Sequence, residues 1–233
     1  MIRGVLFDLD GTLIDTWDLY LEAYTRALEP HFKRRLTLEE LVALRPTSEL
    51  RLLRRVLGSP EAAAAHHEFL RQYRDLHTVL FGGVYPGVPE MLVAIRRTGL
   101  PLGIVTGKSR PAWEITASHA KLGAFQVIVT DEDVQEAKPS PEGLALALRQ
   151  LAIPPAEALY VGDSAGDARA ARAAGVRFGA ALWPKAKDEI DAFVALIGGT
   201  GDPFLLREPQ DLVITLNSPS GWGGRARAVP PTL

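Results

Sequence analysis

Cysteine is absent from this chain of 233 residues. Its absence excludes disulfide bonds, thiolate metal sites and catalysis by a thiol, and it fits a reducing compartment. A strong charge of either sign is also absent, because 26 Lys and Arg residues nearly balance 28 Asp and Glu residues, for a net charge of −2. The chain therefore has no overall field that attracts nucleic acid or an anionic membrane, and we expect neither as a partner.

Long hydrophobic runs are missing as well. No uninterrupted apolar stretch approaches the roughly 18–20 residues that a membrane span requires. The sequence opens directly on the apolar stretch Ile2–Phe7, which leaves no room for a signal segment before it. We therefore expect a cytoplasmic protein. Its 47% hydrophobic and 23% charged residues are ordinary for a globular domain.

Short apolar runs alternate with longer helical patterns along much of the chain. Six runs are typical of buried strands, the last two less clearly than the others: Val5–Asp8, Leu102–Thr106, Val127–Thr130, Ala158–Gly162, Arg177–Leu182 and Leu212–Leu216. Helical patterns lie between the later runs, at Val88–Arg97, Pro111–Lys121, Pro141–Leu151 and Asp167–Ala174. This alternation predicts an α/β fold with a three-layer, Rossmann-like core, in which helices cover both faces of a mainly parallel sheet.

The segment from Asp15 to Phe81 departs from this alternation. It shows helical patterns only, at Asp18–Leu28, Leu38–Leu44, Ser48–Leu57 and Pro60–Leu76. Turn-forming residues from Phe81 to Gly87 close it and have the composition of a hinge. We predict an all-helical cap domain (15–81) inserted into a discontinuous core (1–14 and 82–216), followed by a Gly- and Pro-rich tail (217–233).

Two aspartates, Asp8 and Asp10, directly follow the first predicted strand and precede Gly11. Residues two apart on a strand point to the same side, so these carboxylates are expected to leave the strand end together. Two like charges at that distance repel, and each favours protonation of the other unless a cation lies between them. The pair therefore indicates a divalent metal site, an acid–base pair, or both.

Polar residues also follow the next two strands. Thr106-Gly107-Lys108-Ser109 offers a hydroxyl, a close-approaching backbone N–H and a helix cap, which together suit a phosphate, although Thr-Gly before a helix is more often simple turn chemistry. Lys138 lies after the third strand and before Pro139, which keeps it extended at the rim of the sheet. It is either a solvated lysine or a cation that neutralises a phosphate or braces carboxylates.

Two further aspartates follow the fourth strand. Asp163 occupies the strand end as Asp8 does, and no helix cap explains it, so it is the better candidate for a metal ligand. Asp167 has a structural explanation, because Ser164 and Asp167 match an S-x-x-D capping box at the start of a helix. Ligands of open α/β sheets bind at the carboxyl ends of the strands, where all four segments are expected to lie.

Taken together, these four segments resemble the haloacid dehalogenase (HAD) superfamily, specifically its phosphoglycolate phosphatase-like members with a helical cap. The resemblance spans Asp8 to Asp167 and places the insert where the family carries its cap. It implies that Asp8 is the nucleophile that forms an aspartyl phosphate, and that Asp10 protonates the leaving oxygen and then activates water. It further implies that Thr106, the Gly107 backbone and Lys138 bind the phosphoryl group.

The resemblance also implies a Mg²⁺ cofactor. Asp8, the carbonyl of Asp10 and Asp163 would ligate it, with Asp167 holding one of these ligands in place or contacting a metal-bound water. A site of carboxylates without His or Cys agrees with the preference of magnesium for oxygen ligands. Dehalogenases of the family lack the second aspartate of the first motif and need no metal, so Asp10 favours phosphoryl chemistry.

We therefore expect a Mg²⁺-dependent phosphatase that acts on a small phosphomonoester such as phosphoglycolate, as a monomer or homodimer. A sugar-phosphate mutase of the β-phosphoglucomutase kind would use the same residues, and a non-catalytic phospho-ligand-binding protein is an alternative of another class. Arg45, before Pro46 in a predicted turn of the cap, is a candidate contact to a carboxylate or second phosphate of the substrate. Many relatives have Asn where this chain has Gly107, which removes a side-chain contact but keeps the backbone N–H.

Overall fold

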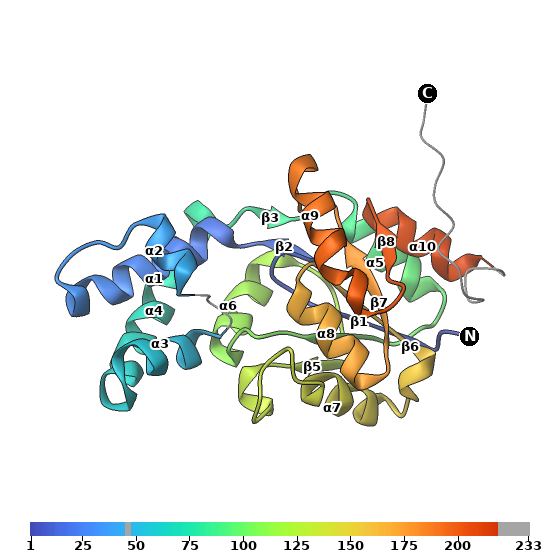
Figure 1. The fold of residues 1–233 in the computed structure, drawn as a ribbon, viewed down its shortest axis with the longest axis horizontal. Coiled ribbons are helices and arrows are strands. Elements are labelled where there is room, and N and C mark those ends of the chain that lie inside the picture. Colours follow the sequence, from blue (N-terminus) through green and yellow to red (C-terminus); the bar gives the residue numbers. More distant parts are fainter. Residues whose placement is uncertain (45–47, 219–233) are drawn as a thin grey trace.

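A six-stranded parallel sheet forms the centre of the computed structural model, which describes residues 1–44 and 48–218 (Figure 1). The strand order is β5-β4-β1-β6-β7-β8, and every neighbouring pair is parallel. The strands are β1 (Gly4–Phe7), β4 (Leu102–Val105), β5 (Val127–Val129), β6 (Ala158–Gly162), β7 (Arg177–Ala181) and β8 (Phe204–Leu206). The predicted mainly parallel sheet is confirmed, with β1 in its middle.

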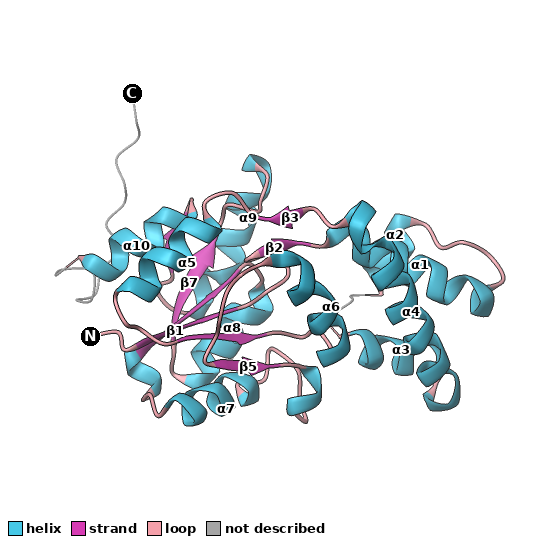
Figure 2. Ribbon diagram, turned by 180° about the vertical axis from the view of Figure 1, so that it is seen from behind, coloured by secondary structure: helices cyan, strands magenta, loops and turns pink. Residues whose placement is uncertain are grey.

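Helices cover both faces of this sheet, as predicted (Figure 2). Alternate residues of β1 reach the two faces: Val5 and Phe7 join one buried apolar cluster, whereas Leu6 joins the other. The first cluster includes residues of α5 (Val88–Arg97), α6 (Arg110–Ala120) and α10 (Pro209–Asn217). The second includes residues of α7 (Glu142–Leu151), α8 (Ala165–Ala174) and α9 (Lys187–Ile197). Short 3₁₀ turns lie at Asp131–Asp133, Pro155–Glu157 and Gly198–Thr200.

The strand predicted at Leu212–Leu216 is wrong, because this apolar run lies inside α10. Pro209 opens the helix, and the carboxylate of Asp211 accepts the backbone N–H of Glu208 at 3.1 Å, which caps its first turn. Leu212 is buried against the sheet, and α10 packs on α5. The last strand of the sheet is instead β8, which follows the Gly-rich loop. Of the predicted tail, residues 219–233 lie outside the described part of the chain.

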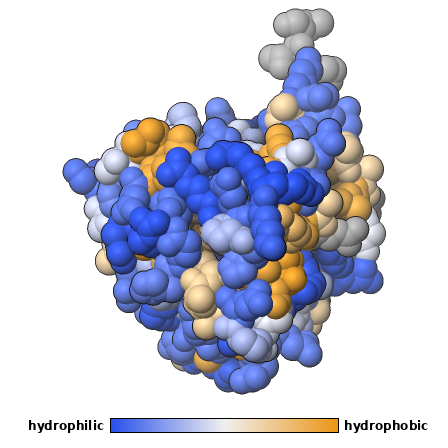
Figure 3. All heavy atoms as spheres, turned by 90° about the vertical axis from the view of Figure 1, so that its left-hand side faces the viewer, coloured by the Kyte–Doolittle hydropathy of each residue, from blue (hydrophilic) through white to orange (hydrophobic). Residues whose placement is uncertain are grey.

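The helical segment forms a separate apolar cluster at one end of the molecule (Figure 1). Its helices are α1 (Trp17–Phe32), α2 (Leu38–Ala43), α3 (Glu49–Leu57) and α4 (Ser59–Leu80), and α1 packs mainly on α4. The outer surface of this end is largely hydrophilic with separate hydrophobic areas (Figure 3). Within the described residues, no helix is both long and apolar enough to span a membrane.

Two short strands lie at the junction between the helical segment and the sheet. β2 (Ile14–Asp15) and β3 (Gly83–Val84) pair in antiparallel fashion, so the chain leaves the core and returns to it side by side. Asp15, expected in a segment without strands, therefore belongs to β2. The division into a core of 1–14 and 82–216 and a cap of 15–81 stays a prediction. Below, "the cap" denotes α1 to α4.

Candidate active site

The ends of β1, β4 and β6 bring the predicted site residues to one edge of the sheet. Asp8 directly follows β1 and is only 7% exposed. Its backbone N–H donates to the carbonyl of Val161 at 2.8 Å, which extends the pairing with β6 one residue beyond β1. The chain then turns sharply at Gly11, whose φ of +76° suits glycine. Thus the parallel register places Asp8 beside the end of β6, where Asp163 follows.

Lys138 is a brace between two carboxylates and not a solvated lysine. Its Nζ donates to Oδ1 of Asp8 at 2.7 Å and to Oδ1 of Asp167 at 2.7 Å. The hydroxyl of Tyr160, in β6, lies 3.0 Å from the same Nζ and 2.8 Å from Oδ1 of Asp167. The Lys138 side chain is 18% exposed, so its charge lies in a partly desolvated environment, where ion pairs are stronger than in water.

Asp167 serves two purposes at once. The predicted capping box is present, since the N–H of Ser164 donates to Oδ2 of Asp167 at 3.1 Å and the N–H of Asp167 donates to Oγ of Ser164 at 3.1 Å. The other oxygen, Oδ1, accepts from Lys138. Helix capping therefore fixes a fully buried carboxylate within the site, so the capping role of Asp167 and a role in the site are compatible.

Asp163 lies beside the turn that follows β1. Its Oδ1 accepts from the Thr12 hydroxyl at 3.2 Å, and its Oδ2 accepts from Nζ of Lys185 at 3.3 Å. A Cβ at Gly11 would lie 2.8 Å from the nearest oxygen of this carboxylate. Glycine is therefore needed at position 11 both for the backbone conformation and for the approach of Asp163.

The carboxylates differ in how well the protein neutralises them. Burial raises the pKa of Asp8 well above its ordinary value, against the opposing effect of Lys138. Burial and the nearby Asp167 raise the pKa of Asp163 to about 6. Burial acts the same way on Asp167, but Lys138 and hydrogen bonds from Ser164 and Tyr160 outweigh it and lower its pKa. The protein thus compensates the ionised forms of Asp8 and Asp163 incompletely.

The acidic residues fit a hard divalent cation. Carboxylate oxygens of Asp8, Asp163 and Asp167 all lie within 4.8 Å of one another. The set contains oxygen donors only, and two of its members have raised pKa values that a nearby cation would lower. Mg²⁺ matches such a site, because it prefers oxygen ligands and retains part of its water shell.

Thr106 and Gly107 line a small cavity together with Lys138. The cavity has a volume of about 20 Å³, enough for about one water molecule. The Thr106 side chain is buried at the end of β4, where its Oγ1 accepts the N–H of Lys108 at 3.1 Å. Ser109 caps α6 by accepting the N–H of Ala112 at 3.4 Å. The predicted phosphate-binding residues are thus brought next to the brace that holds Asp8.

The Asp10 carboxylate has partners of its own. The Thr16 hydroxyl donates to its Oδ1 at 2.6 Å, and Nζ of Lys108 lies 3.1 Å from the same oxygen. Burial opposes the charge on Lys108, but Asp10, Tyr73 and Glu49 outweigh it and raise the pKa of Lys108 above its ordinary value. Lys108 therefore remains an ammonium group beneath the cap.

Sequence reasoning missed several residues around the site. Lys108 and Lys185 each contact a predicted site carboxylate, and Tyr160 supports Lys138. Lys108 belongs to the Thr-Gly-Lys-Ser stretch that follows the second predicted strand. Its position in that stretch was the only feature of the sequence that pointed to it. Tyr160 lies within an apolar strand, where nothing in the local pattern distinguishes it from a core residue. Arg45 lies outside the described residues.

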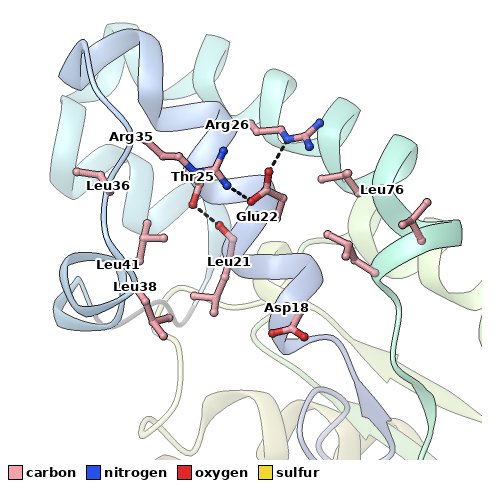
Figure 4. A pocket seen from close by; sticks show the side chains of 12 residues that line it. Asp18, Leu21, Glu22, Thr25, Arg26, Arg35, Leu36, Leu38, Leu41 and Leu76 are labelled. Atoms are coloured by element: carbon pink, nitrogen blue, oxygen red, sulfur yellow. Dashed lines mark hydrogen bonds and ion pairs between the residues drawn. The ribbon is translucent and has the colours of Figure 1, made fainter.

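A surface groove in the cap is lined by none of the predicted site residues that the structure describes. It has a volume of about 550 Å³ and lies between α1, α2 and α4 (Figure 4). Leucines form much of its wall, and Glu22 pairs with Arg26 and Arg35 across it. The groove is therefore separate from the cluster of carboxylates at the sheet edge.

Comparison with known proteins supplies a family for this geometry. The sequence model of the haloacid dehalogenase-like hydrolase family matches residues 5–181 of this chain. The pyrophosphatase PpaX of Anoxybacillus flavithermus is 31% identical over 223 residues, which cover 92% of this chain and 97% of the relative. The N-acetylmuramic acid 6-phosphate phosphatase of Pseudomonas aeruginosa is 34% identical over 198 residues, covering 78% and 82%. The structure of CbbY from Rhodobacter sphaeroides in complex with phosphate superposes with a TM-score of 0.70 at 29% identity, covering 78% of this chain and 86% of that one.

Proposed function

Since the chain belongs to the haloacid dehalogenase-like hydrolase family, we propose that it is a Mg²⁺-dependent phosphatase of a small phosphorylated metabolite. The observation that carries the proposal is the contact of Asp8 with Lys138, beside Asp163 and Asp167 and two residues before Asp10. An anionic carboxylate attacks an anionic phosphate only where positive charge reduces their repulsion. Lys138 provides that charge at the nucleophile itself.

In the first step, an oxygen of Asp8 attacks phosphorus as the bond from phosphorus to the leaving oxygen breaks. Asp10 gives its proton to the leaving oxygen, so the alcohol departs neutral. Thr106 and the N–H of Gly107 bind the phosphoryl oxygens, and Lys138 neutralises part of their charge. The product of this step is an aspartyl phosphate on Asp8 and a free alcohol.

In the second step, water attacks the phosphorus of the aspartyl phosphate, and Asp10 accepts the proton of that water. The bond between phosphorus and Asp8 breaks, which releases inorganic phosphate and restores both aspartates. The side chains of Asp8 and Asp163, the backbone carbonyl of Asp10 and, directly or through water, Asp167 would hold Mg²⁺. The ion, when bound, neutralises developing charge and fixes the geometry of transfer. The balance of the two steps is phosphomonoester plus water giving alcohol plus phosphate.

A panel of phosphorylated compounds tests the substrate. We propose phosphoglycolate-like monoesters first, and the names of the relatives add pyrophosphate and N-acetylmuramic acid 6-phosphate. Phosphate release is measured with Mg²⁺, with p-nitrophenyl phosphate as a generic substrate. No release from any member would overturn the phosphatase and favour a non-catalytic phospho-ligand-binding protein. Conversion of a hexose 1-phosphate into a hexose 6-phosphate without phosphate release would instead identify a mutase.

A further inference from the structure

Lys108 is a core residue whose charged end is buried under the cap. It follows β4, and its side chain is fully inaccessible to solvent. Its Nζ donates to the hydroxyl of Tyr20 at 2.7 Å and to that of Tyr73 at 2.9 Å, and it lies 3.1 Å from Oδ1 of Asp10. An ammonium group has three N–H donors, so these three acceptors use all of them. Lys108 therefore has no donor left for a substrate while these contacts persist.

The cap supplies most of this environment. Tyr20 belongs to α1 and Tyr73 to α4, and Nζ of Lys108 lies 4.2 Å and 4.7 Å from the centres of their rings. Glu49, in α3, accepts from the Tyr20 hydroxyl at 2.5 Å and from the N–H of Ser109 at 2.8 Å. A buried ammonium without such partners would be costly, because it would lose its hydration without compensation. The environment of Lys108 is thus complete only when the cap covers the site.

Asp10 is held through its Oδ1. The Thr16 hydroxyl donates to this oxygen at 2.6 Å, and Nζ of Lys108 lies 3.1 Å from it. We assign the transferred proton to Oδ2, because two groups already contact Oδ1. Fixing one oxygen also fixes the direction in which the other can act, which is the geometric requirement for general acid–base catalysis.

We propose that Lys108 is a positioning residue for Asp10 and makes proton transfer conditional on the cap. With Tyr20 and Tyr73 in place, the ammonium group is held against Oδ1, and Oδ2 stays aligned for the leaving oxygen. When the cap moves away, water replaces the two hydroxyls and the alignment is lost. The inference rests on the phosphatase mechanism proposed above, in which Asp10 is the acid and then the base.

The leaving group distinguishes this role from a merely structural one. An alkoxide needs a proton as it departs, whereas dinitrophenolate is stable enough to leave unprotonated. A misaligned Asp10 therefore slows the first step for alkyl phosphates and barely changes it for dinitrophenyl phosphate. General misfolding or a distorted phosphate site would slow both alike.

The test compares Lys108→Met with the unaltered protein on two substrates, 2,4-dinitrophenyl phosphate and the best alkyl phosphate of the panel. We expect kcat/KM for the alkyl phosphate to fall by about 100-fold, and that for the dinitrophenyl ester to change by less than about threefold. We expect kcat to fall for both, because Asp10 must still activate water in the second step. An equal loss of kcat/KM on both substrates, or no loss on either, would overturn the proposal.

Two further variants keep the test decisive. Lys108→Gln retains a donor and serves if Lys108→Met does not fold, as judged by circular dichroism; the same leaving-group pattern is expected with a smaller amplitude. Arg71→Met is the matched control, because Arg71 is exposed on α4 and pairs with Glu68 of the same helix without touching Lys108. It should leave the rates on both substrates unchanged. If the unaltered protein hydrolyses neither substrate, the proposed function is overturned, and the inference on Lys108 falls with it. If the unaltered protein hydrolyses both substrates and Lys108→Met shows no leaving-group pattern, only the inference on Lys108 is overturned.

Discussion

Nζ of Lys138 lies 2.7 Å from Oδ1 of Asp8, so the proposed nucleophile is already paired with a cation inside the protein. The contact uses one carboxylate oxygen and leaves the other to attack phosphorus. Asp167 shares the same ammonium group at 2.7 Å, which fixes where Lys138 stands. The pair therefore reduces the repulsion between carboxylate and phosphate without occupying the attacking atom.

Replacing Asp8 by Asn should abolish turnover and leave the fold intact. The amide has the size of the carboxylate but is a far poorer nucleophile, so we expect phosphate release to fall by about 10⁴-fold or more. Because burial raises the pKa of Asp8, an uncharged side chain should not lower the thermal midpoint. Asp188→Asn, on the exposed start of α9, is the control and should keep full activity. An active Asp8→Asn protein would refute the assignment of the nucleophile.

Gly11→Ala should damage both stability and magnesium binding. The φ of +76° makes any other residue strained there, and the new Cβ would meet the Asp163 carboxylate at 2.8 Å. Since Thr12 and Lys185 hold that carboxylate, we expect a loss of about 1–3 kcal/mol of stability and weaker Mg²⁺ binding. Gly99→Ala has a similar φ of +78° with open space around its Cβ, so it should lose stability alone. Calorimetric titration with Mg²⁺ and urea unfolding separate the two effects.

Much of the fold could be predicted because its strands are short apolar runs bounded by turn-forming residues. Leu212–Leu216 shows where this reasoning fails. Its β-branched residues resemble a strand. The helix is set instead by Pro209 and Asp211, which precede the run, and by packing on α5. That packing is a tertiary contact, so no local pattern contains it.

That several predicted site residues lie together has a related reason. Asp8, Thr106 and Asp163 each follow a strand directly, and parallel strands bring their carboxyl ends to one edge. The contacts of Lys108 with Tyr20 and Tyr73 depend instead on how the cap lies over the core. That arrangement is tertiary, so the spacing of residues along the chain does not reveal it.

Magnesium binding should weaken in acid. Burial and Asp167 raise the pKa of Asp163 to about 6, so below that pH a proton occupies a ligand that the metal requires. We expect the affinity for Mg²⁺ to fall by up to about tenfold for each pH unit below 6. Titration calorimetry between pH 5 and 8 measures this, and EDTA should remove activity that added Mg²⁺ restores.

The same raised pKa has a second consequence for the metal-free protein. The folded state holds the Asp163 proton more tightly than the unfolded state, so this group favours folding below the ordinary aspartate pKa. That contribution is lost as the pH rises through about 6, and bound Mg²⁺ should compensate for it. In Asp163→Asn both the pH dependence of binding near 6 and this loss should disappear; their persistence would assign them to another group.

His77 should make the junction between the cap and the core sensitive to acid. It lies in α4, is 1% exposed and stacks on His119 of α6 with ring centres 4.1 Å apart. Neither of its ring nitrogens has a hydrogen-bond partner among the described residues. Burial, followed by the charges of His119 and Lys108, lowers the pKa of His77 to about 4. In mild acid, the unfolded chain therefore binds a proton at His77 that the folded protein does not bind.

The sign follows from this difference. Above pH 6.5 His77 is neutral in both the folded and the unfolded state, so it does not change the free energy of unfolding. As the pH falls from 6.5 through about 4, the free energy of unfolding decreases. We expect His77→Phe, which keeps a stacked ring, to reduce the loss between pH 7 and 4.5 by about 1–3 kcal/mol in urea unfolding. His67→Gln, exposed on the same helix, is the control and should keep the original slope. If the slope is unchanged in His77→Phe as well, the acid sensitivity belongs to other groups and not to His77, because protonation of His77 would then carry no cost.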